Sequence, residues 1–133
     1  IGRECSGDSR LPRREALTRA FSAIEEHERG LCLRMIEGLK QVEGIKIWGI
    51  TDPKRVSERS PTVSFTHPKM EAAEIGRMLA DMGVFVWAGN FYALELTEAL
   101  GLEPEGVLRA GVLHYNTMGE VERFVSSVSN ILE

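Results

Sequence analysis

An arginine in the middle of an expected strand is the residue of this sequence best suited to bind a ligand. In the stretch 107–113 (VLRAGVL), one alternating set of side chains is entirely apolar and the other contains Arg109. A guanidinium there needs an anion or access to water, and its planar fork suits a bidentate contact with a carboxylate or phosphate. An arginine on the solvated face of a one-sided antiparallel sheet explains the same pattern without any ligand.

A tight turn and a helix are expected directly after this strand. Asn116 suits the turn, and Thr117 followed by Glu120 has the capping-box pattern of a helix start. Apolar residues then recur at helical spacing, namely Val121, Phe124, Val125, Val128 and Ile131. The sequence therefore predicts a strand, a turn and an amphipathic helix as one C-terminal unit.

Composition and charge limit the classes of protein to which the chain can belong. Its 133 residues suit one modest domain, and a net charge of -4 gives no basic surface for nucleic acid. Because there is neither an apolar run of about 20 residues nor a signal-peptide pattern, we expect a cytoplasmic protein without a membrane partner. Cys5 and Cys32 are too few for a disulfide framework and lack metal-site spacing. Both are expected to be free thiols, with Cys32 buried as a small apolar residue.

Periodicity predicts a single domain at 13–133, preceded by a flexible N-terminal segment, residues 1–12. The expected elements are a helix at 13–41, a strand at 45–50, a loop at 51–60, a strand at 62–66, a helix starting at His67, an interior strand at 84–88, a short helix at 94–100, and the strand and helix described above. Four strands with helices mainly on one face make a two-layer α+β domain with an antiparallel or mixed sheet.

One side of each element is expected to supply the core. The apolar residues concerned are Leu17, Phe21, Ile24, Leu31, Met35 and Leu39 in the long helix, Val63 and Phe65 in the second strand, and Ala72, Ile75, Leu79 and Met82 in the middle helix.

Three segments resemble the C-terminal small domain of class V aminotransferases. These pyridoxal-phosphate (PLP) enzymes include cysteine desulfurases, selenocysteine lyases and isopenicillin N epimerase-like proteins. The segments are EGIKIWGI with PTVSFT, then EAAEIGRMLADMGVFVWAGNFYALEL, and finally LRAGVLHYNTMGEVERF. The resemblance covers the chain from about residue 13 to its end. It implies the small domain of a PLP-dependent transferase or lyase of fold type I that acts as a homodimer on an amino acid.

Carried over to this sequence, the resemblance gives Arg109 the role of binding the α-carboxylate of the substrate. Asn90 and Tyr92 are then substrate-binding residues in the active-site loop 89–92. In desulfurases this loop carries a reactive cysteine, whereas here it is Gly-Asn-Phe-Tyr, which puts sulfur abstraction in doubt. Simple packing at a helix start explains Phe91 and Tyr92 equally well.

The lysine that binds PLP in this family lies in a larger domain ahead of the matched region. None of the lysines here matches its segment; they are Lys40, Lys46, Lys54 and Lys69. We therefore expect no cofactor bound to this chain alone, no turnover by it alone, and a PLP-binding large domain as its partner. A stand-alone amino-acid-binding module and a protein-interaction domain are the alternatives.

Overall fold

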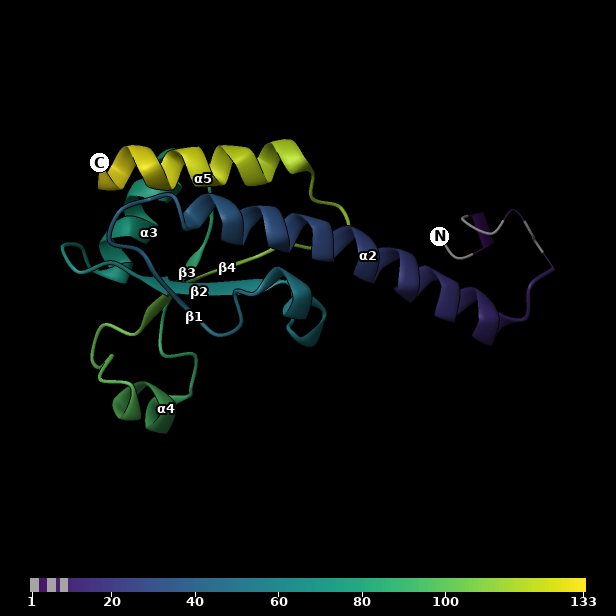
Figure 1. Ribbon diagram of the computed structural model, residues 1–133, viewed down its shortest axis with the longest axis horizontal. Helices are drawn as coiled ribbons and strands as arrows, with labels where there is room; N and C mark the ends of the chain where they lie inside the picture. The colour runs from purple at the N-terminus through teal and green to yellow at the C-terminus, as the bar shows by residue number, and fades with distance from the viewer. Residues whose placement is uncertain (1–2, 5–6, 8–9) are drawn as a thin grey trace.

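The computed structural model describes residues 3–4, 7 and 10–133 and shows a sheet layered against helices (Figure 1). In chain order the elements are α2 (Arg13–Leu39), β1 (Lys46–Trp48), the 3-10 helix η1 (Pro53–Glu58), β2 (Thr62–Thr66), α3 (Ala72–Asp81), β3 (Trp87–Gly89), α4 (Leu94–Ala99), β4 (Val107–Gly111) and α5 (Met118–Leu132). The prediction of a flexible segment at 1–12 falls partly outside the described residues, and Cys5 lies outside them.

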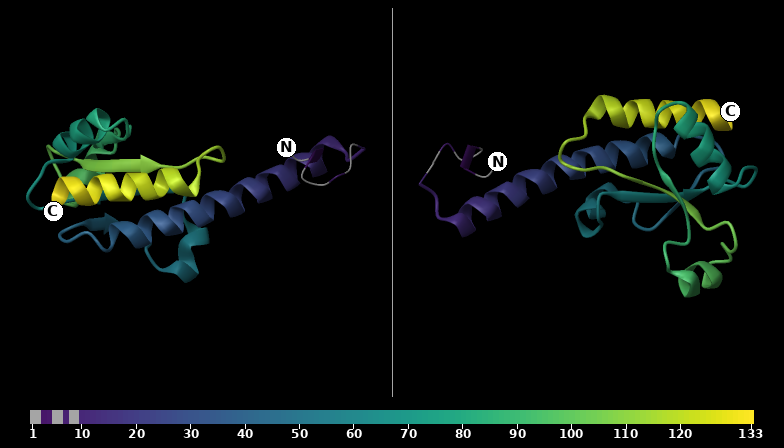
Figure 2. Two further views of the ribbon diagram at one scale, coloured as in Figure 1. Left: turned by 90° about the horizontal axis from the view of Figure 1, so that it is seen from above. Right: turned by 180° about the vertical axis from the view of Figure 1, so that it is seen from behind.

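The four strands form one antiparallel sheet in the order β1, β2, β4, β3. Helices α2, α3 and α5 cover one face, and the short α4 lies on the other side of the sheet (Figure 1, Figure 2). This arrangement confirms the predicted two-layer α+β domain with helices mainly on one face. Of the two sheet types left open, the antiparallel one is correct.

Alternating side chains of β2 and β4 form the sheet side of the core. Val63 and Phe65 of β2 and Leu108 of β4 are inaccessible to solvent, as the alternation predicts. The helices contribute Leu31, Met35, Ile36 and Leu39 of α2, Ile75 and Leu79 of α3, and Val121, Phe124 and Val128 of α5. Burial of each such side chain contributes roughly 1.5–3 kcal/mol. This face of the sheet is used for packing, so only the opposite face is free to carry a site.

The N-terminus of α5 is fixed by the capping box that the sequence predicts. The Thr117 hydroxyl accepts a hydrogen bond from the Glu120 N–H at 3.3 Å, and the Glu120 carboxylate accepts one from the Thr117 N–H at 2.7 Å. The backbone and side-chain hydrogen bonds from Thr117 lower the pKa of Glu120. In the preceding turn, the Asn116 side-chain oxygen accepts from the Leu113 N–H at 2.8 Å. Strand, turn and helix therefore form the predicted unit.

The helix predicted to start at His67 begins instead at Ala72. His67 and Met70 form an isolated antiparallel bridge, so the chain makes a turn at the end of β2 before the helix starts. The His67 Nδ1 atom accepts from the Lys69 N–H at 3.3 Å, which gives this turn a hydrogen bond of its own. Met82, predicted to lie on the buried side, is the C-cap of α3 and is exposed.

The stretch 51–60, predicted as a loop, contains the helix η1. The Asp52 carboxylate caps it by accepting from the Lys54 N–H at 2.9 Å, and Arg55 pairs with Glu58 at 2.7 Å. Local hydrogen bonds thus order a stretch whose composition indicates only exposure.

The strand predicted as interior is the edge strand β3, which pairs with β4 alone. Val84 and Val86 pack against the core, whereas Phe85 and Trp87 are 85% and 72% exposed. Apolar residues on both alternating sets therefore do not indicate burial on both faces here, because nothing covers the second face at this edge among the described residues.

The N-terminal half of α2 extends away from the sheet (Figure 2). Leu31, Met35 and Leu39 in its second half are buried as predicted. Leu17 and Phe21 belong to the same periodic pattern, but both are exposed, Phe21 by 66%. The helix therefore carries an apolar face beyond the body of the domain.

Candidate functional site

Arg109 lies at the centre of the sheet face that the three long helices leave open. It is opposite Ser64 of β2 and Trp87 of β3, and Trp48 of β1 is in turn opposite Ser64. Directly opposite residues of antiparallel strands point to the same face, so these four side chains form one row across the sheet. Arg109 itself is exposed. Arg109 therefore lies on a solvent-exposed face of the sheet, as the explanation without a ligand predicts. The segment that carries α4 lies on the same side of the sheet.

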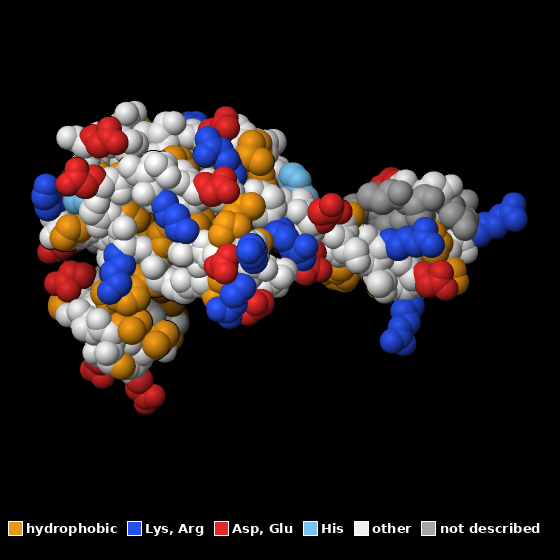
Figure 3. All heavy atoms as spheres, viewed as in Figure 1, with side chains coloured by type: hydrophobic (Ala, Val, Ile, Leu, Met, Phe, Trp, Pro, Cys, Tyr) orange, Lys and Arg blue, Asp and Glu red, His pale blue; other side chains and the backbone are white. Residues whose placement is uncertain are grey.

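A hollow of about 480 Å³ lies on this face, between the sheet and the segment that carries α4. Its lining includes Trp48, Ser64, Asn90, Phe91, Leu96 and Arg109. Figure 3 shows hydrophobic side chains gathered on the segment around α4, below the body of the domain. The volume lies within the range of roughly 300–1,000 Å³ in which proteins bind small molecules. The size and the mixed lining both suit a small organic ligand.

The guanidinium of Arg109 lies over the ring of Phe91, with its central carbon 3.7 Å from the ring centroid. Such a cation–π contact orients the guanidinium and contributes roughly 0.5–2 kcal/mol. Among the described residues, no carboxylate pairs with Arg109 and no acceptor takes a hydrogen bond from it. Its N–H donors are therefore available to an anion in the hollow.

Residues 89–92 form a strained bend that brings Asn90 and Phe91 into the hollow. Phe91 and Tyr92 have φ angles of 57° and 62°, in the left-handed region that costs a non-glycine residue roughly 1–2 kcal/mol. The Asn90 side-chain oxygen accepts from the Tyr92 N–H at 3.2 Å and so supports the turn. Strained backbone of this kind persists where its surroundings fix it, and it is concentrated at ligand-binding sites.

Gly106 fixes the base of this bend by a close backbone contact. Its φ is +67°, and a Cβ at this position would lie 2.3 Å from the carbonyl carbon of Gly89. The hydroxyl of Thr97, the buried residue of α4, lies within hydrogen-bond distance of the Ala93 carbonyl, at 3.2 Å, and of the Glu103 carboxylate, and its single O–H is shared between these acceptors. The segment between β3 and β4 is therefore tied together by its own contacts.

Two of the three predicted site residues line the hollow. Arg109 and Asn90 are in its lining, whereas the Tyr92 side chain is fully exposed and is not. Sequence reasoning did not single out Ser64 and Trp48, because their place beside Arg109 depends on the register of three strands. The alternation of PTVSFT does place Ser64 on the outward side of its strand, which is the signal that could have identified it.

All four lysines are exposed and lie outside the lining of the hollow. Lys46 lies 3.7 Å from the centroid of the Trp48 ring, and Lys40 donates to the Thr51 carbonyl at 2.9 Å. The chain therefore offers surface ammonium groups and no buried amine next to Arg109.

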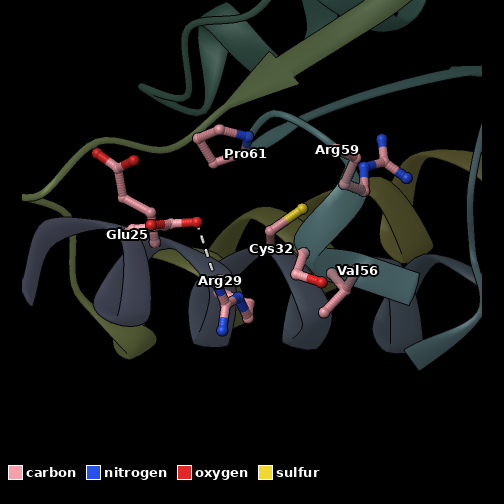
Figure 4. Close-up of a pocket in the computed structure, with 8 residues that line it drawn as sticks. Glu25, Arg29, Cys32, Val56, Arg59 and Pro61 are labelled. Atoms are coloured by element: carbon pink, nitrogen blue, oxygen red, sulfur yellow. Dashed lines mark hydrogen bonds and ion pairs between the residues drawn. The ribbon is translucent and has the colours of Figure 1, made fainter. Parts of the chain in front are cut away.

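Cys32 belongs to α2, which covers the opposite face of the sheet from the hollow. It is a free thiol, 1% exposed, and burial raises its pKa. Figure 4 shows its sulfur directed toward the segment of Arg59 and Pro61, beside a cavity of about 40 Å³. Cys32 is thus the small buried residue that the sequence predicts, and it is remote from Arg109.

The described residues contain neither a candidate metal site nor a candidate membrane-spanning helix. In residues 3–4, 7 and 10–133, no three His, Cys, Asp or Glu side chains come together in a way that could hold a metal ion. None of the helices in these ranges combines the length and the apolar character needed to cross a bilayer.

Comparisons with known proteins connect this geometry to a family. The model of the family described as aminotransferase class-V matches residues 17–124. The probable cysteine desulfurase 2 of Mycobacterium leprae is 38% identical over 113 residues, which make up 85% of this chain and 26% of that protein. The aminotransferase-like protein FGM3 of Gibberella zeae is 34% identical over 116 residues, which make up 84% of this chain and 28% of that protein.

Solved structures share the fold. The apo cysteine desulfurase from Thermococcus onnurineus matches with a TM-score of 0.78 and 28% identity, covering 90% of this chain and 28% of that one. The cysteine desulfurase CsdA from Escherichia coli matches with a TM-score of 0.70 and 26% identity, covering 81% of this chain and 25% of that one. The chain spans about a quarter of the length of these relatives.

Proposed function

Because the chain belongs to the class V aminotransferase family, we propose that it is the C-terminal, substrate-binding part of a PLP-dependent enzyme that acts on an amino acid. The observation that carries this proposal is the position of Arg109, which lines an open hollow and has neither a carboxylate nor a hydrogen-bond acceptor as partner among the described residues. Relatives with the names cysteine desulfurase and aminotransferase-like protein support the class of enzyme.

Arg109 binds the α-carboxylate of the substrate. Two parallel N–H···O hydrogen bonds from its fork hold both carboxylate oxygens, which fixes the direction of the bonds at the α-carbon. The Phe91 ring supports one face of the guanidinium, and Ser64 is its neighbour on β2. The charge, the planar shape and the open position of this side chain thus suit a carboxylate.

Asn90 and Tyr92 complete the proposed contacts with the substrate. The Asn90 oxygen already accepts from the Tyr92 N–H, so its NH₂ group is the part that donates to a ligand in the hollow. Tyr92 is on the outer side of the bend, where its phenol meets a ligand only when a partner surface closes over the hollow.

The residues of this chain do not fit covalent attachment of PLP. Enzymes of this class hold the cofactor through a lysine, and all the lysines here are exposed and outside the hollow. No chemical step through the cofactor is therefore assigned to this chain. The lysine belongs to a PLP-binding large domain, which we expect as the partner.

The exposed face of α2 supports such a partner. Leu17 and Phe21 are exposed on a part of the helix that extends beyond the domain body (Figure 2). Exposed apolar side chains of this size are typical of surfaces that contact another protein. We assign this face to contact with the PLP-binding domain, within a dimeric enzyme.

Persulfide formation is not assigned to the bend. Residues 89–92 contain no cysteine, and Cys32 is buried on the other side of the sheet. Only a thiolate can take sulfur from a substrate by the usual route. The chain is therefore suited to holding an amino acid, and the bond that is broken depends on the rest of the enzyme.

A stand-alone amino-acid-binding module is the second candidate. The observation in its favour is that the hollow and Arg109 belong entirely to this chain. Such a module binds its ligand without any cofactor domain.

Calorimetric titration of the 133-residue chain with amino acids distinguishes the two candidates. The enzyme proposal predicts weak binding that is lost in Arg109→Ala, because half of the site is missing. Micromolar binding without cofactor favours the module. A second experiment tests whether PLP attaches covalently to a lysine of this chain. The chain is incubated with PLP and reduced with borohydride, and the labelled peptides are identified by mass spectrometry. Preferential labelling of one lysine contradicts the assignment of the cofactor to another domain.

A further inference from the structure

The lining of the hollow is mainly apolar and contains one charged side chain. Arg109 is the single charged residue in its lining, and the polar Ser64 lies opposite it on the neighbouring strand. Much of the remaining lining is apolar and consists of Trp48, Leu96, Leu100, Leu102 and Val107. A ligand held by Arg109 therefore extends along an apolar surface.

We infer that the amino acid bound by Arg109 has a large, uncharged, apolar side chain, of the leucine or phenylalanine kind. This inference rests on the proposed role of Arg109 in binding the α-carboxylate. With the carboxylate at Arg109, a side chain that carries a second charge loses water and gains no partner in the apolar lining, which lowers its affinity. An apolar side chain gains by leaving water on the same surface.

Two polar side-chain oxygens of the lining, those of Thr97 and Asn90, already have partners within the chain. The single O–H of Thr97 is shared between the Ala93 carbonyl and the Glu103 carboxylate. The oxygen of Asn90 accepts from the Tyr92 N–H. No acidic residue is in the lining, so a basic side chain of a ligand has no counter-charge there. The lining thus favours apolar surface and offers no counter-charge to the side chain of lysine or arginine.

The volume of the hollow favours a large side chain over a small one. A hollow of about 480 Å³ offers an alanine methyl group little contact, whereas a leucine or phenylalanine side chain fills more of it and contacts more of its apolar lining. Added apolar groups in a hydrophobic pocket change affinity by roughly 10–200-fold. Because Leu96 and Leu100 are partly exposed, we expect the lower end of this range.

Titrations of the full 133-residue chain, followed by nuclear magnetic resonance, test the inference. The ligands are alanine, leucine, phenylalanine, glutamate and lysine, with leucinamide as the leucine analogue that has no carboxylate. We expect leucine and phenylalanine to bind roughly tenfold more tightly than alanine. Glutamate and lysine are expected to bind no more tightly than alanine, and leucinamide more weakly than leucine.

Two leucines of α4 provide a matched pair of variants. Leu96 lines the hollow and Leu94 does not, although both are exposed residues of the same short helix. Leu96→Asn is expected to remove the preference for leucine over alanine, whereas Leu94→Asn retains it. Neither side chain belongs to the core, so both variants are expected to fold.

The outcomes separate this inference from the proposed function. If alanine, leucine and glutamate bind equally and all lose affinity in Arg109→Gln, the apolar selection is wrong while the carboxylate role stands. Equal loss of the leucine preference in Leu94→Asn and Leu96→Asn also overturns it. If no binding depends on Arg109, the proposed function fails and this inference fails with it.

Discussion

The Arg109 guanidinium carbon lies 3.7 Å from the centroid of the Phe91 ring, so the middle of β4 and the bend after β3 meet at one point. Phe91 holds a left-handed backbone conformation at this point, with a φ of 57°. The contact leaves the fork of the guanidinium without a protein acceptor among the described residues. A strained aromatic residue thus supports the one cation of the hollow.

Phe91→Ala is expected to weaken the binding of amino-acid carboxylates by several-fold. Loss of the contact frees the guanidinium to rotate, and a cation–π contact at such a site contributes roughly 0.5–2 kcal/mol. The measurement is a double-mutant cycle with Arg109→Gln, in which Phe91→Ala has no further effect once the arginine is absent. Tyr115→Ala is the control, because Tyr115 is an exposed aromatic residue that does not line the hollow. An undiminished effect of Phe91→Ala in the Arg109→Gln background contradicts the role of Phe91 as a positioning residue.

Gly106→Ala is expected to disrupt the hollow, whereas Gly101→Ala is not. Both glycines have a φ close to +67°, so both variants carry the backbone cost of roughly 1–2 kcal/mol. Only at Gly106 does a Cβ meet the Gly89 carbonyl carbon, at 2.3 Å, while Gly101 faces open space. Chemical denaturation and ligand titration measure the two effects. Equal losses of stability and binding in the two variants show that the close contact does not fix the bend.

Thr117→Ala is expected to lower the free energy of unfolding by about 1 kcal/mol. The variant removes the acceptor for the Glu120 N–H at the first turn of α5. Thr117→Ser keeps the hydroxyl and is the matched control, with stability close to that of the unchanged chain. Urea denaturation measures both, and a Thr117→Ser variant as unstable as Thr117→Ala points to the lost methyl group as the cause.

In the Thr117→Ala variant, the free energy of unfolding is expected to fall less on acidification than in the unchanged chain. Hydrogen bonds from the Thr117 backbone and side chain lower the pKa of Glu120 below its ordinary value of 4.5. The stability that the ionised Glu120 carboxylate contributes is therefore fully present above pH 4.5. It is lost as the pH falls through the lower pKa of Glu120 in the folded chain. Denaturation of the Thr117→Ala chain across this range is expected to show a shallower pH dependence, and an identical slope contradicts the link.

Phe21→Asp is expected to weaken association of this chain with a PLP-binding domain and to leave its own folding unchanged. Phe21 is exposed on the part of α2 that extends beyond the domain body, so its ring adds nothing to the core (Figure 2). Analytical ultracentrifugation of the chain with such a domain measures the association. Ser22→Asp, at another exposed position of the same helix, adds the same single negative charge and is the control. Loss of stability in Phe21→Asp indicates that the ring packs within this chain instead.

Local patterns were sufficient to predict the parts of the fold that depend on local chemistry. The alternation in β2 and β4 and the capping box of α5 are confirmed because each depends on residues a few positions apart. Tertiary neighbours decide the rest. Phe85 and Phe21 belong to apolar patterns and are nevertheless exposed, because the edge of the sheet and the end of α2 have no cover among the described residues.

The site shows the same division. Arg109 was predicted from its strand pattern, whereas its neighbours Ser64 and Trp48 follow from strand register. The resemblance to the family predicts Tyr92 as a substrate-binding residue, but its side chain is fully exposed and is not in the lining of the hollow. Sequence thus identifies the cation, and the structure identifies what surrounds it.

The affinity of Arg109→Lys for leucine tests the central claim most directly. Lysine keeps the positive charge but cannot form the two parallel hydrogen bonds of the guanidinium fork, so a loss of roughly tenfold or more is expected. Arg19→Lys, on the exposed surface of α2, is expected to bind leucine like the unchanged chain. Equal leucine affinity in Arg109→Lys and the unchanged chain would contradict bidentate binding of the carboxylate at Arg109.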